Sequence, residues 1–338
     1  MNQTTLKALW GLSGENSVES TETLCLDVYD FFCGCGGFGQ GCVQAGHRVV
    51  FACDSNPDAL AVHAANHEDA THLCASLPVK RCQLPFPVDG RPFHVHGSPP
   101  CTTFSTMNSR SNGEALAAGR TKATRLVRWY LKMALASGCT SWTMEQVPSP
   151  LVLAVVERVR RKNLNRMDYG IFEFRDLGVP QTRTRLIAGT PELIARLRRL
   201  LCHSRRRSVL DVLPSARGTH VRSSLRWETA RLRHLRRPGE SKYVYSPSPD
   251  PLHAAHPVTG PAPTVVTTGP LKWATRGVAA QPTLAVKELA ALQTFPLTYV
   301  LPENQKLGQL LVGNAVPPLV AQLLMTTRGH HNQAWRVV

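Results

Sequence analysis

The residues best suited to chemistry are a thiol, a carboxyl group and two guanidinium groups, each at or near the expected end of a strand. They are Cys101, Glu145, Arg183 and Arg185. Two prolines before Cys101 fix the backbone and should project its side chain from the carboxyl edge of a sheet, where open α/β proteins bind ligands. A cysteine held there is a candidate nucleophile, although most cysteines are simply small buried residues. The two arginines are two residues apart, so we expect them on one face of a strand, where a guanidinium, the thiol and the carboxyl group could converge on one ring.

A glycine-rich segment precedes these residues and is typical of a nucleotide-binding turn. Residues 34–39 (GCGGFG) fit the pattern G-x-G-x-x-G directly after an apolar run, and Asp54 lies 20 residues beyond Gly34. Glycines let the backbone approach a ligand closely, and a carboxylate at the end of the next strand can bind a ribose hydroxyl. Such turns also occur merely to make tight corners, so the pattern alone leaves both interpretations open. A ligand bound here is expected to contain a nucleoside.

The elements that must position these residues alternate between short strands and helices. Strands are predicted at residues 28–33, 49–53, 93–96 and 141–144, with a further pair at 169–174 and 185–188. Helices are predicted from Pro57 to Asn66, from Lys122 onward, and at 286–292 and 316–324, because apolar residues recur there at helical spacing or a proline opens the first turn. The alternation predicts an α/β fold with a mostly parallel sheet and helices on both faces.

One internal segment carries most of the positive charge. The chain has a formal net charge of +16, and Leu193 to Gly239 contains 13 Arg, no Lys and two acidic residues. A solvated helix surface or a disordered tail would also explain such a run, but its internal position favours a binding insert, with a polyanion as partner. The stretch from Ser246 to Pro270 holds seven prolines and is expected to be an extended linker.

Length and composition exclude several classes of protein. The chain has 338 residues, of which 43% are hydrophobic and 18% charged, as in an ordinary globular protein. Its uninterrupted apolar runs fall far short of the roughly 20 residues that cross a bilayer, and the first twenty residues lack the pattern of a secretory signal. We therefore expect an intracellular protein without a membrane span, in nucleus or cytoplasm, with its ten cysteines as thiols.

Six blocks of residues, in order along the chain, resemble the DNA cytosine-carbon-5 methyltransferases. They are residues 30–37 (DFFCGCGG), 97–101 (GSPPC), 145–147 (EQV), 181–185 (QTRTR), 292–296 (LQTFP) and 313–318 (GNAVPP). The resemblance covers roughly Leu26 to Leu324, apart from the basic and Pro-rich segments, where this family places a variable target-recognition region. The Pro-Pro-Cys and Gln-x-Arg-x-Arg blocks together are strongly specific, whereas the glycine turn is shared with many nucleotide-binding folds.

The resemblance implies a Rossmann-like, S-adenosylmethionine-dependent methyltransferase fold with a small irregular target-recognition region. Residues 26–190 would form the catalytic domain, and residues 191–275 the basic and Pro-rich target-recognition region. Residues 276–338 would return to the catalytic domain. Residues 1–25 match no block and are expected to be an N-terminal extension.

The same resemblance implies S-adenosylmethionine as cofactor, double-stranded DNA as partner, a monomer, and no metal or membrane. The residues implied to bind the cofactor follow the strands or lie in the last block: Phe32, Gly34, Gly36, Gly37, Asp54, Ser55, Pro99, Asn314 and Ala315. Asn314 and Pro317 are expected to fix the turn into the last helix and to wall the cofactor pocket. The Cys33 and Cys35 pair is interpreted as loop packing rather than zinc ligation.

The chemistry that the resemblance implies begins with addition of the Cys101 thiolate to carbon 6 of cytosine, which makes carbon 5 able to attack the sulfonium methyl group. Glu145 would hold or protonate ring nitrogen 3 and bind the exocyclic amine, and Arg185 would contact the carbonyl oxygen at carbon 2. Arg183 would position the strand or the nucleophile loop. The target base must leave the duplex, and residues 102–120 are the expected mobile lid.

Four features depart from the family pattern. Gln146 and Thr102 replace a usual Asn and Gln, Lys287 replaces a frequent Arg, and residues 72–76 lack the Asp that usually contacts adenine. None removes the nucleophile, the carboxyl group or the paired arginines, so we expect an active enzyme.

Three other functions are the alternatives. A catalytically silent nucleic-acid-binding protein would explain the departures. A transfer RNA methyltransferase of the same fold is the nearest enzyme, but its usual Cys-Phe-Thr signature is not seen in the recognition region. A nicotinamide dehydrogenase would leave the Pro-Pro-Cys and Gln-x-Arg-x-Arg blocks unexplained.

Overall fold

The computed structural model describes residues 24–79, 84–100, 122–202, 204–214, 242–245, 256–269, 271–275 and 282–326. Several parts of the chain singled out above lie outside these described residues. They are the N-terminal residues 1–23, Cys101, the expected lid at 102–120, and residues 215–241 of the basic segment.

A seven-stranded sheet forms the centre of the larger lobe, in the order β3-β2-β1-β4-β5-β7-β6. The strands are β1 (Asp27–Phe31), β2 (Arg48–Asp54), β3 (Thr71–Cys74), β4 (Phe93–Gly97), β5 (Ser141–Gln146), β6 (Asp168–Glu173) and β7 (Thr184–Gly189). The first five run parallel, whereas β7 is antiparallel to both β5 and β6. The predicted mostly parallel sheet and the predicted β6–β7 pair are both confirmed.

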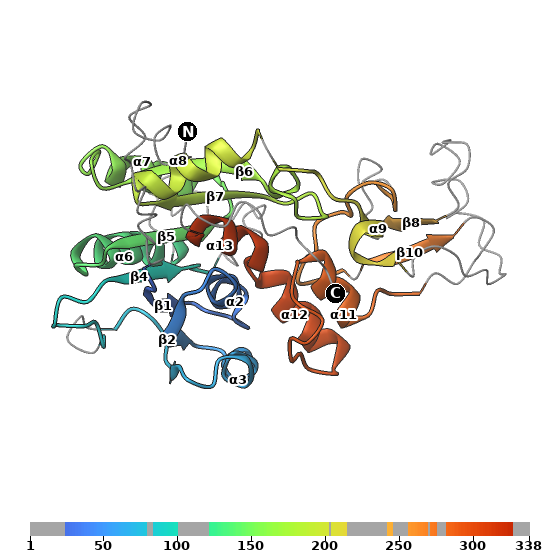
Figure 1. Ribbon diagram of the computed structural model, residues 1–338, viewed down its shortest axis with the longest axis horizontal. Coiled ribbons are helices and arrows are strands. Elements are labelled where there is room, and N and C mark those ends of the chain that lie inside the picture. The colour runs from blue at the N-terminus through green and yellow to red at the C-terminus, as the bar shows by residue number, and fades with distance from the viewer. Residues whose placement is uncertain are drawn as a thin grey trace, which may run out of the picture.

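Helices cover both faces of this sheet (Figure 1). One face carries α6 (Lys122–Ala136) and α7 (Pro150–Arg160), and the other carries α2 (Gly37–Gln44), α3 (Pro57–Asn66), α8 (Pro191–Leu200) and α13 (Pro318–Met325). Successive strand residues point to opposite faces, so Val28 of β1 packs in the α2 cluster and Tyr29 in the α6 cluster. The central strands are therefore buried on both sides.

The first and last helices of the described chain pack directly against each other, as the blue α2 and red α13 show in Figure 1. Two glycines on one face of α2 make this possible. A Cβ atom on Gly37 would lie 2.2 Å from the carbonyl oxygen of Val316, and one on Gly41 would lie 2.2 Å from that of Pro318. Since neither backbone can withdraw easily, only glycine fits at these positions. This contact places the C-terminal segment beside the helix that follows the glycine turn.

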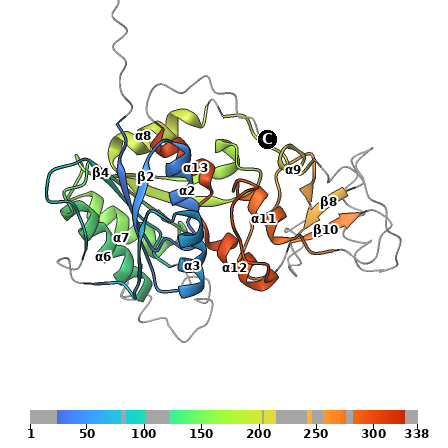
Figure 2. The same ribbon diagram turned by 60° about the horizontal axis from the view of Figure 1, so that its bottom comes forward.

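A smaller lobe lies at one end of the molecule (Figures 1 and 2). Its antiparallel sheet has the order β10-β8-β9, formed by β8 (Lys242–Tyr245), β9 (His256–Pro257) and β10 (Lys272–Thr275). The helices α9 (Val209–Val212), α11 (Val286–Leu292) and α12 (Gln305–Asn314) lie beside it. Val244, Trp273 and Leu289 belong to one buried cluster, so sheet and helices share a core.

The start of the basic segment belongs to the larger lobe rather than to a separate region. Helix α8 buries Leu193, Ile194 and Leu197 against β6, β7 and α13. Its arginines alternate with these apolar residues at helical spacing, so one face enters the core and the other stays charged. The boundary expected at residue 191 therefore falls before a helix of the catalytic sheet.

The Pro-rich stretch is extended, as predicted, but its described part is packed rather than a free linker. Val258, Ala262 and Val265 are buried in the core of the smaller lobe. The backbone of Ala262 pairs with Pro180 and Thr182 through hydrogen bonds of 2.9 Å each. The error arose because prolines fix an extended backbone whether or not it is buried.

The stretch Gln305–Met325 is long and apolar enough, with a mean hydropathy of 1.4, to cross a membrane. It comprises two helices, α12 and α13, separated by residues 315–317. Inside the fold 72% of its most apolar window is buried. We interpret these helices as part of the protein core, since they cover α2 and α11.

Candidate active site

The segments that follow β1, β2 and β4 are joined by hydrogen bonds into one surface at the carboxyl edge of the sheet. The backbone N–H of Gly34 donates to Oδ2 of Asp54 at 2.9 Å. The N–H of Ser98 donates to the carbonyl oxygen of Phe31 at 3.2 Å. The glycine turn, the acidic residue that ends β2 and the segment leading toward Cys101 are therefore neighbours, because their strands are parallel and adjacent.

The three glycines expected to bind a cofactor have different surroundings. Gly34 has φ +55°, and a Cβ atom there would meet no heavy atom within 4 Å. At Gly36 a Cβ would lie 2.6 Å from Oη of Tyr299, and at Gly37 it would meet the carbonyl of Val316. Gly34 thus faces open space, whereas Gly36 and Gly37 let the turn pack on the protein beneath it.

Asp54 combines structural hydrogen bonds with spare acceptor capacity. Its two carboxylate oxygens each accept one backbone N–H, from Gly34 at 2.9 Å and from Asn56 at 2.8 Å. A carboxylate has about four lone-pair sites, and the side chain is only half-buried. Ser55 beside it is exposed. An acceptor next to the open space at Gly34 suits a ribose hydroxyl, so these residues fit a nucleoside-containing group such as S-adenosylmethionine.

Glu145 and Arg185 form an ion pair between neighbouring strands. Nε of Arg185 lies 2.8 Å from Oε1 of Glu145, and the two side chains are only 16% and 9% exposed. Glu145 pairs with Ile187 in the β5–β7 register, which places Arg185, two residues earlier, on the same face. Glu145 lies inside β5 rather than just beyond it, because the strand continues to Gln146.

The two arginines of the Gln-x-Arg-x-Arg block have different partners. Arg183 precedes β7 and is 2% exposed. Its guanidinium donates to the carbonyl oxygens of Val265 at 3.0 Å, Gly313 at 3.1 Å and Ala315 at 3.3 Å. Arg183, directly before β7, therefore joins this strand to the C-terminal segment and the Pro-rich stretch.

Gln146, the departure from the usual Asn, connects β5 to the segment before the candidate nucleophile. Its Nε2 donates to the carbonyl oxygen of Pro99 at 2.7 Å, and its Oε1 accepts the N–H of Val147 at 2.7 Å. Gln146 is 1% exposed. The longer side chain thus supplies hydrogen-bond partners for the carbonyl oxygen of Pro99 and the N–H of Val147.

The remaining residues expected near the cofactor are Phe32, Asn314, Ala315 and Pro317. Phe32 has φ +55° and meets Trp129 edge to face, with ring centroids 6.3 Å apart. Asn314 ends α12 and is exposed, and Ala315 is buried with its Cβ 3.1 Å from the Cβ position at Gly37. Pro317 precedes the first residue of α13, as expected for a residue that fixes that turn.

Sequence reasoning missed the residues that support the glycine turn from below. The hydroxyl of Tyr299 donates to the carbonyl oxygen of Cys35. Burial lowers the pKa of His63 to about 2 and that of His67 to about 4, so both rings are neutral at pH 7, and Nδ1 of His63 lies 2.9 Å from Nε2 of His72. The i, i+4 spacing of the two helical histidines was the only available signal.

The thiols near the turn are inert by burial. Burial raises the pKa of Cys33 well above its ordinary value and that of Cys35 to about 12. The eight cysteines among the described residues are all free. Within the described ranges no group of three or more His, Cys, Asp or Glu side chains is arranged to hold a metal ion.

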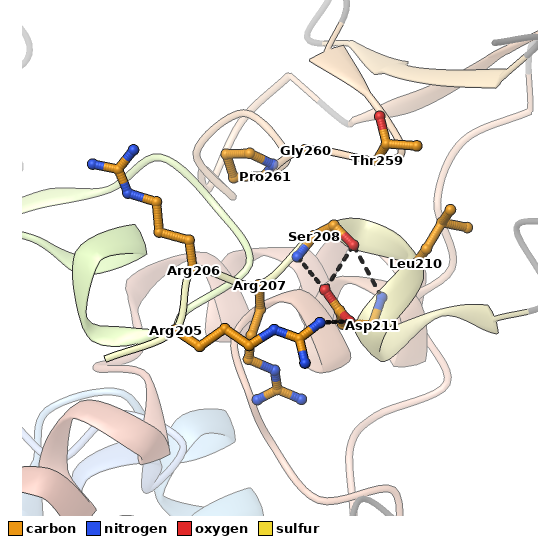
Figure 3. Close-up of a pocket in the computed structure, with 9 residues that line it drawn as sticks. All are labelled: Arg205, Arg206, Arg207, Ser208, Leu210, Asp211, Thr259, Gly260 and Pro261. Atoms are coloured by element: carbon orange, nitrogen blue, oxygen red, sulfur yellow. Dashed lines mark hydrogen bonds and ion pairs between the residues drawn. The ribbon is translucent and has the colours of Figure 1, made fainter. Parts of the chain in front are cut away.

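A basic pocket of about 340 Å³ lies where α8 leads into α9 (Figure 3). Arg205, Arg206 and Arg207 line it, with residues 259–261 across from Ser208 and Asp211. Ser208 and Asp211 form a capping box, in which Oδ2 of Asp211 accepts the N–H of Ser208 at 2.6 Å. Arg205 and Arg206 are exposed and pair with Asp211 and Asp176, whereas Arg207 is half-buried.

Comparison with known proteins places this site in a family context. The family model described as C-5 cytosine-specific DNA methylase matches residues 26–130 and 227–329. Type II methyltransferase M.HgiDI of Herpetosiphon aurantiacus is 25% identical over 317 residues, which cover 89% of this chain and 94% of that protein. Type II methyltransferase M.AgeI of Thalassovita gelatinovora is 38% identical over 94 residues, which cover 27% of this chain and 22% of that protein.

Solved structures share the fold across most of the chain. A putative DNA modification methyltransferase encoded within an E. coli prophage superposes with a TM-score of 0.61 at 17% identity, covering 89% of this chain and 97% of that one. The S. pombe Dnmt2 methyltransferase superposes with a TM-score of 0.53 at 15% identity, covering 88% and 96%. At such identities the likeness concerns the fold alone.

Proposed function

The chain belongs to the C-5 cytosine-specific DNA methylase family, and from this premise we propose that it transfers a methyl group from S-adenosylmethionine to carbon 5 of cytosine in double-stranded DNA. The observation that carries the proposal is the sheltered pair of Glu145 and Arg185, 2.8 Å apart. It lies one residue from Gln146, which binds Pro99 just before Cys101. A carboxyl group, a guanidinium and the approach to a thiol thus belong to one short stretch of the sheet edge.

The pyrimidine ring would be activated by residues of this chain. The Cys101 thiolate adds to carbon 6, and the electron pair released into the ring makes carbon 5 nucleophilic. Glu145 holds ring nitrogen 3 and the exocyclic amine, so it neutralises charge that develops during the attack. Arg185 donates to the carbonyl oxygen at carbon 2 and keeps the carboxyl group oriented. Arg183 acts as a positioning residue through the backbone that it binds.

The cofactor would lie along the glycine turn. Gly34 leaves the space, Asp54 binds the ribose hydroxyls, and Phe32, Ser55 and Pro99 line the neighbouring edge. Ala315 and Asn314 close the opposite side. When bound there, S-adenosylmethionine would supply an electrophilic methyl group to carbon 5. A base would then remove the carbon-5 proton, and the Cys101 thiolate would leave carbon 6, which restores the aromatic ring.

The DNA would meet the positively charged part of the chain. Arg205, Arg206 and Arg207 around the basic pocket contact phosphates, which contribute affinity and salt dependence rather than sequence recognition. The target cytosine must be extruded from the duplex, since a stacked base hides both ring faces. Residues 102–120, which follow the nucleophile, would close over the flipped base.

The decisive experiment uses duplex DNA that contains 5-fluorocytosine, incubated with S-adenosylmethionine and the full chain. Fluorine at carbon 5 blocks the final elimination, so the proposal requires a covalent DNA–peptide adduct at Cys101 by mass mapping. Cys101→Ser is the control for the nucleophile, and Glu145→Gln the control for ring activation. Absence of an adduct and of methyl transfer across varied DNA would overturn the proposal, and labelling of transfer RNA instead would assign the substrate to RNA.

A further inference from the structure

A row of five polar side chains crosses the middle of the parallel sheet, with its three central members buried and the serines at its two ends partly buried. Strands of such sheets are ordinarily almost continuous in apolar residues. The row runs through Ser141, His94, Thr143, His96 and Ser98. Four contacts link it, two at each imidazole: Ser141 Oγ–His94 Nδ1 (2.8 Å), His94 Nε2–Thr143 Oγ1 (3.0 Å), Thr143 Oγ1–His96 Nδ1 (2.9 Å) and His96 Nε2–Ser98 Oγ (2.9 Å).

The sheet register aligns this row with the proposed active site. His94 pairs with Ser141 and His96 with Thr143 between β4 and β5. Alternate residues share a face, so the next position on this face of β5 is Glu145. On the β4 side the row ends at Ser98, the first residue after the strand and three residues before Cys101.

The row is fixed in orientation and fully paired. Phe38 of α2 stacks on His96 with ring centroids 3.4 Å apart and planes 5° apart, and on His94 at 5.7 Å. Burial lowers the pKa of His94 to about 3 and that of His96 well below its ordinary value. Each neutral ring has one donor and one acceptor, and every ring nitrogen faces a hydroxyl that can take either role.

Stability alone does not explain why polar side chains occupy these positions. Buried polar groups contribute little net stability even when paired, and apolar residues of similar volume often do as well. The hydrogen bonds do, however, fix one geometry, because shifting Ser98 would leave an imidazole nitrogen unpaired. Ser98 is also held by Phe31 through its backbone N–H, and the next residue, Pro99, by Gln146.

We propose that His96 is a positioning residue of the methyltransferase: through Ser98 it sets the place of the segment Ser98-Pro99-Pro100, and with it the reach of the Cys101 thiol toward the target ring. The inference rests on the proposed function for the identity of the nucleophile. It assigns the two buried histidines of β4 to the active site, although neither touches substrate or cofactor.

Two substitutions at the same position separate the two contacts of His96. In His96→Gln the terminal amide occupies the place of Nε2 and keeps the contact with Ser98. In His96→Asn the amide occupies the place of Nδ1 and keeps only the contact with Thr143. Ser98→Ala removes the contact from the other side. Ser141→Ala is the matched control, because it removes one partly buried hydroxyl at the far end of the row.

The first readout is the single-turnover rate of adduct formation on 5-fluorocytosine DNA at saturating DNA and cofactor. We expect His96→Asn and Ser98→Ala to lower this rate at least about tenfold, since small misplacements of a reacting group are costly. His96→Gln and Ser141→Ala should stay within about twofold of the wild type, and saturating DNA and cofactor make the rate independent of affinity in all four variants. Equal losses in His96→Gln and His96→Asn, following only their loss of stability, would overturn the inference.

The second readout does not depend on catalysis. The alkylation rate of Cys101 by iodoacetamide, followed by mass spectrometry, reports the position and exposure of the thiol. It should change in His96→Asn and Ser98→Ala and stay unchanged in His96→Gln and Ser141→Ala. If the wild type forms no adduct but this pattern holds, the proposed function fails while the positioning stands. If alkylation is the same in all four variants, the positioning role is wrong.

Discussion

The side-chain amide of Gln146 donates a hydrogen bond to the carbonyl oxygen of Pro99 at 2.7 Å. This bond joins the strand that carries Glu145 to the segment that leads into Cys101, across 47 residues of sequence. It means that the carboxyl group and the thiol cannot move independently if the bond persists. A residue that departs from the usual pattern of the family therefore serves as a connection between the two halves of the proposed site.

Gln146→Glu tests this connection with little change in shape. The carboxylate still accepts the N–H of Val147 but cannot donate to Pro99, so a buried carbonyl oxygen loses its partner. We expect methyl transfer to fall at least about tenfold, because the nucleophile segment is released. Cofactor affinity by calorimetry should stay within a few-fold. Wild-type turnover in this variant would show that the bond to Pro99 is not required.

Alanine substitution should affect stability and cofactor binding differently at two glycines that have different surroundings. Gly41→Ala places a Cβ 2.2 Å from the carbonyl oxygen of Pro318, so α2 and α13 must separate, and we expect a loss of about 2 kcal/mol or more in unfolding free energy. Gly34→Ala meets no atom within 4 Å and should cost only about 1 kcal/mol for its positive φ. Its larger effect should be weaker cofactor binding, and equal losses of affinity in both variants would contradict this division.

The two arginines of residues 181–185 form a second contrasting pair. Arg183→Lys leaves buried carbonyls of Val265, Gly313 and Ala315 without full pairing, so we expect about 3 kcal/mol less unfolding free energy in chemical denaturation. Arg185→Lys keeps the positive charge beside Glu145, so we expect a smaller loss of unfolding free energy than in Arg183→Lys. It should nevertheless lower turnover at least about tenfold, because a lysine cannot reproduce the planar contact with Glu145 and the base. The opposite assignment of losses would refute these roles.

Acidification should destabilise the protein through its buried histidines. The pKa of His94 falls from 6.5 to about 3 on folding, so between pH 7 and 5 only the unfolded chain gains this proton. Protonation of the unfolded chain therefore lowers the unfolding free energy by about 2 kcal/mol between pH 7 and pH 5. The unfolding free energy keeps falling until the pH reaches the pKa of His94 in the folded protein, near 3. His94→Gln should show a pH dependence weaker by this amount in denaturation at pH 7 and pH 5.

The buried carboxyl group of Asp30 has the opposite effect on the pH dependence of the unfolding free energy. The comparison of wild type with His94→Gln requires this effect to be equal in both proteins. Burial raises the pKa of Asp30 well above its ordinary value, so its stabilising contribution is present at low pH and is lost as the pH rises. Asp30 is present in both the wild type and His94→Gln, so the difference between the two proteins isolates His94. Parallel pH profiles would show that His94 is not buried in its neutral form.

The basic pocket should contribute to the salt dependence of DNA binding. Arg205→Ala and Arg206→Ala are each expected to reduce the slope of log affinity against log salt by about 1, if each arginine neutralises one phosphate. Arg161→Ala is the matched control, since this arginine of the opposite face is 75% exposed and pairs with Glu157. Identical slopes for all three variants, measured by fluorescence anisotropy, would remove the pocket from the DNA-binding surface.

The alternation of strands and helices was predictable because periodicity is local. The strands β1, β2, β4, β5, β6 and β7 were all placed within a few residues of their observed ends. The same local rule failed for burial. The run Phe-His-Val-His of β4 alternates apolar and polar residues, which is typical of a strand with one face in water, yet both histidines are buried. Phe38 covers them, and nothing within β4 reveals that cover.

The sequence by itself determined the order of the strands along the chain, the glycine turn, and the family to which the six blocks point, since each depends on residues close together in the chain. Only the tertiary structure decided which side chains meet: Arg183 with three distant carbonyls, Gln146 with Pro99, and His96 with Ser98 and Thr143. These contacts depend on which strands are neighbours, on their register and on the helix packed above them. Periodicity specifies none of the three, because one local pattern is compatible with several strand orders.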